Sequence, residues 1–86
     1  MTRAPRPGAR VAIRVDADQY EAETGVVLPH GRATGVVVTV EAPDHPDDAP
    51  VIKVRLDRPA ADAVRGGTTR TAYFVPTDLR RLRPGR

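Results

Sequence analysis

The stretch TAYFVPTDLRRL, residues 71–82, decides the fold class. An extended apolar run stops at Pro76, a short polar turn with Asp78 follows, and a second short segment carries Leu79 and Leu82. Proline has no backbone N–H to donate to a strand ladder, so Pro76 ends the first of these strands. The order of strand, proline turn and short strand is typical of the end of a small β-domain.

Upstream of this ending, short apolar runs alternate with turn residues. In residues 51–57 Ile52, Val54 and Leu56 alternate with Lys53 and Arg55, which is the period-two pattern of a half-buried strand. Further strands are predicted at residues 10–15, 24–28, 34–41 and 71–76, with Val36, Val38 and Val40 inward in the third segment along the chain. Nine prolines and seven glycines interrupt helical patterns, so we expect only a short helical or 3₁₀ turn at residues 59–65.

Composition excludes several classes of protein. A chain of 86 residues forms one small domain without room for a deep substrate cleft. It contains no cysteine and no serine, and no histidine and carboxylate converge on a threonine, so we expect neither an enzyme nor a metal or cofactor site. No apolar run approaches the length of a membrane span or of a signal-peptide core. We therefore expect a soluble, cytoplasmic protein that does not bind a membrane.

The ending resembles that of SH3-fold domains, in which a strand runs into Val-Pro, one 3₁₀ turn and a last short strand. Val75, Pro76, Leu79 and Leu82 take those places. GARVAIRVDADQYEAETGVVL, residues 8–28, is similar to the opening of KOW-type SH3-like barrels, with a Gly, a Val-rich strand, a loop and a Thr-Gly-x-Val turn. A weaker resemblance links VVLPHGRATGVVVTVE, residues 26–41, to the Tudor-like domain of CarD-type regulators.

This resemblance implies an all-β, five-stranded SH3-like barrel over residues 8–83. We expect disordered tails at residues 1–7, which are basic, and at residues 84–86. KOW-type domains bind RNA or the surfaces of ribosomes and polymerases, and CarD-type domains bind RNA polymerase. Peptide-binding SH3 domains need a groove of several aromatic rings. This chain has only three aromatic residues, so we do not expect proline-rich peptides as ligands.

Positive charge is concentrated at the two ends of the chain. Arg10 and Arg14 belong to the first predicted strand, and Arg80, Arg81 and Arg83 follow the proline turn. The first and last strands of an SH3-like barrel pair, so the five arginines are expected to form one basic face. Such a face binds phosphates through counterion release and tolerates different base sequences. We predict a non-catalytic module that associates with the backbone of RNA or DNA.

A protein partner is the alternative prediction. Exposed apolar or polar residues outside the expected core would then supply the contacts, and the candidates are Tyr20, His30, Val37 and Tyr73. The partner would belong to the transcription or translation machinery, as when a domain docks on RNA polymerase. It could also be a second copy of a structural, oligomerising subunit.

Overall fold

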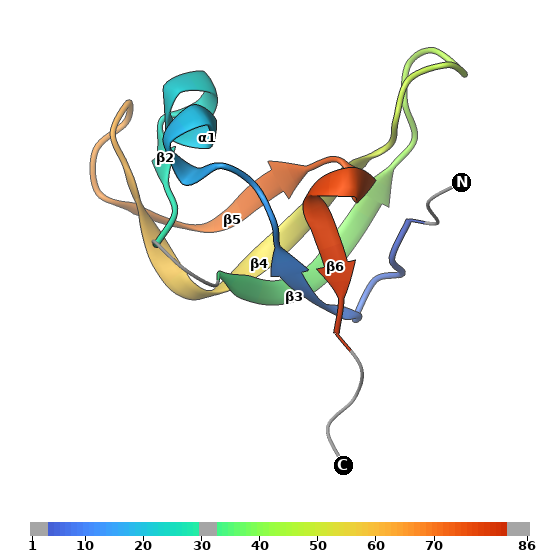
Figure 1. The fold of residues 1–86 in the computed structure, drawn as a ribbon, viewed down its shortest axis with the longest axis horizontal. Coiled ribbons are helices and arrows are strands. Elements are labelled where there is room, and N and C mark those ends of the chain that lie inside the picture. Colours follow the sequence, from blue (N-terminus) through green and yellow to red (C-terminus); the bar gives the residue numbers. More distant parts are fainter. Residues whose placement is uncertain (1–3, 30–32, 83–86) are drawn as a thin grey trace.

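The computed structural model describes residues 4–29 and 33–82, and nearly half of them belong to one antiparallel sheet (Figure 1). The elements in chain order are β1 (Arg10–Ile13), α1 (Ala17–Thr24), β2 (Val26–Val27), β3 (Thr34–Glu41), β4 (Val51–Asp62), β5 (Thr68–Phe74), the 3₁₀ turn η1 (Pro76–Asp78) and β6 (Leu79–Arg81). The all-β fold class is confirmed. The strand count is six rather than the expected five, because the short segment after the 3₁₀ turn, β6, forms a ladder of its own with β1.

Strands distant in sequence become neighbours in the sheet. β1 pairs with β6 on one edge and with the start of β3 on the other, and β3 then pairs with β4. The long strand β4 carries β5 along one edge, while β2 pairs with its last residues. The predicted pairing of the first and last strands is therefore present, with Ala12 opposite Arg80 and Ile13 opposite Leu79.

The core forms where the alternating apolar residues of these strands meet. Ile52, Val54 and Leu56 are at most 2% exposed, as the period-two pattern predicts, and Val11 is fully buried beside them. Burial of such side chains contributes about 1.5 to 3 kcal/mol each, so these strands supply most of the stabilising apolar contact. The segment before β1 also contacts this core, because Pro5 is buried and Gly8 N donates to Val37 O at 2.8 Å.

The predicted inward face of β3 is wrong in its first half. Val37 is 2% exposed and lies opposite Val54 in the core, whereas Val38 is 40% exposed. The ladder between β3 and β4 shifts register between Val37 and Thr39, so Val38 is an extra residue in a bulge. The bulge changes the phase of the alternation, and only Val40 keeps its predicted orientation toward the core.

Two predictions about helical structure are also wrong. Residues 59–62 continue β4, and 63–65 form the turn into β5, so no helical segment occurs there. Pro59 is tolerated because the β4–β5 ladder is interrupted between Arg55 and Ala60, where no N–H is required from it. The helix is instead α1, in the segment expected to be a loop. Asp16 caps its start by accepting from the N–H groups of Asp18 and Gln19, and Gly25 ends it at a φ of 80°.

Candidate functional site

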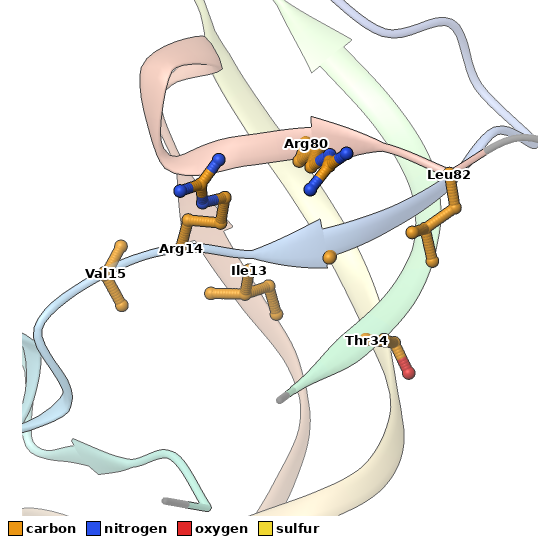
Figure 2. A pocket seen from close by; sticks show the side chains of 7 residues that line it. Ile13, Arg14, Val15, Thr34, Arg80 and Leu82 are labelled. Atoms are coloured by element: carbon orange, nitrogen blue, oxygen red, sulfur yellow. The ribbon is translucent and has the colours of Figure 1, made fainter. Parts of the chain in front are cut away.

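The pairing of β1 with β6 gathers two of the predicted arginines over a hollow. Arg80 lies opposite Ala12 in the ladder, and Arg14 follows the end of β1 on the same outward side. Both line a shallow hollow of about 550 Å³ whose other walls include Thr34 and Leu82. Figure 2 shows the Arg14 and Arg80 side chains close together over the β1–β6 pair, with Leu82 and Thr34 at the opposite end. Two guanidinium groups thus border one open, partly apolar surface.

Arg10 precedes Ala12 by two residues in β1, so it faces the same side of the sheet. It forms an ion pair with Asp57 of β4. Its Nη2 is 2.7 Å from Oδ2 of Asp57, and the hydroxyl of Thr34 donates to the same carboxylate oxygen. The hydrogen bond from Arg10 lowers the pKa of Asp57 most, followed by the hydrogen bond from Thr34, and the positive charge of Arg55 lowers it further. The Asp57 carboxylate is therefore shared among neighbouring donors and stays ionised at neutral pH.

Arg55 belongs to the same surface, although its local sequence pattern does not predict this. In the ladders Arg10 lies opposite Val36, and Val36 lies opposite Arg55, so the two arginines face the same side of the sheet two strands apart. The basic patch defined by these contacts consists of Arg10, Arg14, Arg55 and Arg80, with Asp57 as the acid among them. All four arginines are exposed. The alternation in residues 51–57 pointed Arg55 to water, but only the β1–β3–β4 pairing brings it beside Arg10.

Arg81 does not join the patch. It lies opposite Val11, whose side chain is fully buried, so strand alternation places Arg81 on the opposite side of β6 from Arg80. Arg83 lies outside the described residues. Of the five arginines expected to form one basic face, Arg10, Arg14 and Arg80 lie on the same side of the sheet.

Acidic side chains bound the patch near α1. Arg14 also borders a smaller hollow of about 240 Å³, and the other polar residues there are Asp16, Gln19, Tyr20, Glu23 and Asp78. Asp16 already caps α1, and Asp78 accepts from Val75 N at 3.4 Å. An anion held by Arg14 is therefore favoured on the side that faces Arg80, away from the acidic groups beside α1.

Of the four predicted partner contacts, two belong to the interior. Val37 is in the core, as described above. Tyr20 is 9% exposed, its ring stacks on Phe74 with centroids 5.0 Å apart, and its hydroxyl donates to Tyr73 O at 2.8 Å. Burial raises the pKa of Tyr20 above its ordinary value. Tyr20 therefore holds α1 on the sheet instead of meeting a partner.

The other two partner candidates differ in what is known of them. His30 lies outside the described residues. Tyr73 is 49% exposed on β5 and is available for contact. It belongs to a group of exposed apolar side chains, which we call the apolar surface, on or directly after β3, β4 and β5: Val38, Val51, Tyr73 and Val75.

Within residues 4–29 and 33–82, no three histidine or carboxylate side chains gather closely enough to hold a metal ion. None of the helices in these ranges is long and apolar enough to cross a membrane. The chain matches no protein-family model, no curated protein and no solved structure. The basic patch and the apolar surface are the candidate binding surfaces of the described residues.

Proposed function

We propose that this protein is a non-catalytic binding module whose basic patch holds the phosphate backbone of RNA or DNA. The proposed fold is an SH3-like barrel of the KOW or Tudor-like type. The strand order β6-β1-β3-β4-β5 supports it, as does the 3₁₀ turn between β5 and β6, since both agree with the resemblance of the sequence. In this proposal the protein is a cytoplasmic accessory of the transcription or translation machinery.

The observation that carries the proposal is the grouping of four exposed arginines on one side of the sheet, on β6, β1 and β4 and directly after β1. A guanidinium group is planar, remains charged at every physiological pH and presents N–H donors in a fork that matches phosphate oxygens. Arg14 and Arg80 border one hollow, and Arg10 and Arg55 flank Asp57. Phosphates are thus met by several donors at once, at a hollow that is open to solvent. Backbone binding that tolerates different sequences is the expected result.

The chemistry predicts a strong dependence on salt. Each phosphate neutralised by an arginine releases condensed counterions, so log affinity falls with log salt by about 0.7 per contact for single strands and about 0.9 for duplex DNA. If Arg14 and Arg80 each hold one phosphate, their removal lowers the slope by about 1.4 to 1.8. Affinity should fall to a similar extent for every base sequence.

Fluorescence anisotropy with labelled mixed-sequence RNA and DNA at three salt concentrations tests this. The informative variant is Arg14→Gln with Arg80→Gln, and the matched control is Arg65→Gln with Arg70→Gln. The control removes the same charge from exposed positions in and beside the β4–β5 turn, away from β1 and β6 (Figure 1). We expect the first variant to bind weakly with a shallower slope and the control to bind nearly as the parent does. Equal losses in both variants would mean that net charge alone attracts the nucleic acid.

The apolar surface favours a second candidate function, docking of a protein such as RNA polymerase or oligomerisation of the chain. Four of the five large apolar side chains that are exposed within the described residues belong to it. An apolar centre with a polar rim is typical of a protein interface. This candidate predicts no nucleic-acid binding at physiological salt, in the parent or in any arginine variant. A pull-down from the native host, with and without nuclease, separates a protein partner from one bridged by nucleic acid.

A further inference from the structure

Tyr73 lies at a position where a base could stack beside a bound backbone. Among the aromatic residues in the described structure, Tyr73 is exposed, whereas Tyr20 and Phe74 pack in the core. Tyr73 lies directly opposite Lys53 in the β4–β5 ladder, and the next outward residue along β4 is Arg55 of the basic patch. An exposed ring is therefore adjacent to a lysine and continuous with the arginines.

These residues form a stepped path over the outer side of the sheet. From Arg80 the path crosses to Arg10 on β1, then passes over β3 to Arg55 on β4, and continues along β4 to Lys53 and across to Tyr73. Arg10 and Arg55 are separated by two strand spacings, about 10 Å, and Arg55 and Lys53 by one two-residue repeat, about 7 Å. Each cation is thus within a few nucleotides of the next.

The path is curved. β1 pairs with β3 only at Thr34–Val36, before the bulge at Val38, whereas Lys53 pairs with Thr39 beyond the bulge. A bulge bends the strand and increases its twist. In Figure 1, β1 and β6 accordingly cross β3 at an angle, nearer the viewer than the β4–β5 part of the sheet. A ligand that contacts both Arg80 and Tyr73 must follow this bend.

We infer that the ligand is a single strand of nucleic acid, with its backbone on Arg80, Arg10, Arg55 and Lys53 and one base stacked on Tyr73. The inference rests on the proposed function and names its substrate class. A single strand bends freely and offers unpaired base faces, whereas a duplex is stiff over about 150 base pairs and keeps its bases stacked inside. Stacking on one ring changes affinity by about 5- to 150-fold and accepts any base.

The test measures how the parent, Tyr73→Leu and Tyr73→Phe bind fluorescein-labelled oligouridine and oligothymidine. The same oligothymidine annealed to its complement provides the duplex. Tyr73→Phe is the matched control, because it keeps the ring, and no hydrogen bond of the Tyr73 hydroxyl occurs among the described residues. The Tyr73 carbonyl that accepts from Tyr20 is retained in both variants, so we expect both to fold. Thermal melting checks this before binding is measured.

We expect Tyr73→Leu to weaken single-strand binding by about 5- to 150-fold, Tyr73→Phe to retain it, and duplex binding to be unaffected by either change. The inference is overturned if Tyr73→Leu binds the single strands as the parent does while Arg14→Gln with Arg80→Gln weakens them. That result would leave the proposed function standing. Absence of binding to every oligonucleotide would refute the proposed function itself and favour a protein on this surface.

Discussion

Replacing Tyr20 by Phe should measure what holds α1 on the sheet. The change removes one hydroxyl, which donates to Tyr73 O at 2.8 Å, and keeps the ring stacked on Phe74. A hydrogen bond of this kind contributes about 0.5 to 1.5 kcal/mol to the free energy of unfolding. In a domain of this size each kcal/mol lowers Tm by about 4 to 8 °C, so Tyr20→Phe should lower Tm by about 2 to 12 °C.

Thermal unfolding followed by circular dichroism gives the Tm, and Tyr73→Phe is the control. It also removes a tyrosine hydroxyl, but from a side chain that is half exposed, so its Tm should stay close to that of the parent. Equal shifts in the two variants would refute the reasoning. They would show that the Tyr20 hydroxyl bonds as well to water as to the Tyr73 carbonyl.

The raised pKa of Tyr20 gives the same change a second readout. Burial makes the folded protein hold this proton to a higher pH than the unfolded chain, whose tyrosines have the ordinary value of 10.0. The stabilising effect is therefore complete below pH 10 and is lost as the pH rises through the pKa of the folded state. The Tm difference between the parent and Tyr20→Phe should shrink in this alkaline range and stay constant at neutral pH.

Three further changes test the patch and the sheet. Asp57→Asn removes the carboxylate that holds Arg10, so affinity for nucleic acid should rise and the salt slope should steepen by about 0.7 to 0.9. Little stability should be lost, because the ion pair is exposed. Weaker binding in anisotropy would show that Asp57 orients Arg10 for its phosphate. Gly35→Ala should lower the free energy of unfolding in urea by about 1 to 3 kcal/mol, because a Cβ there would collide with the Arg55 carbonyl and lie 2.6 Å from Val54 Cγ1. An unchanged urea midpoint would mean that β3 and β4 separate easily. Leu56→Asp should abolish cooperative melting while Val75→Asp retains it, since Leu56 is 2% exposed and Val75 is 37% exposed. Cooperative melting of Leu56→Asp together with unfolding of Val75→Asp would contradict the assignment of the sheet faces.

The central parts of the strands follow from local sequence in this protein, whereas some strand ends do not, as in β4, which continues to Asp62. Inward orientation of Ile52, Val54 and Leu56 follows from their alternation with Lys53 and Arg55, because successive side chains of a strand point to opposite faces. Prolines and glycines mark where strands stop, since proline lacks an N–H and glycine tolerates turns. The pairing of β1 with β6 followed from the resemblance to SH3-like endings.

Helix α1 shows a limit of this local information. Its caps are visible in the sequence, with Asp16 before the first turn and Gly25 after the last. The helix has only eight residues and buries only Tyr20, so its sequence lacks the apolar periodicity that predicts a helix. Its stability comes from the contact of Tyr20 with Phe74 and Tyr73, residues more than fifty positions away in the chain.

Only the tertiary structure decided which side chains share a surface. One extra residue at Val38 exchanges the inward and outward positions of β3. The residue type at that position does not indicate a bulge, because the shift depends on how β3 aligns with β4. Arg55 reaches the arginines of the chain ends through two ladders, while Arg81, next to Arg80 in sequence, is turned to the opposite face by alternation. Alternation within a strand is local and can be derived from sequence. The register between strands depends on the balance of contacts across the whole sheet, and that balance determines the basic patch.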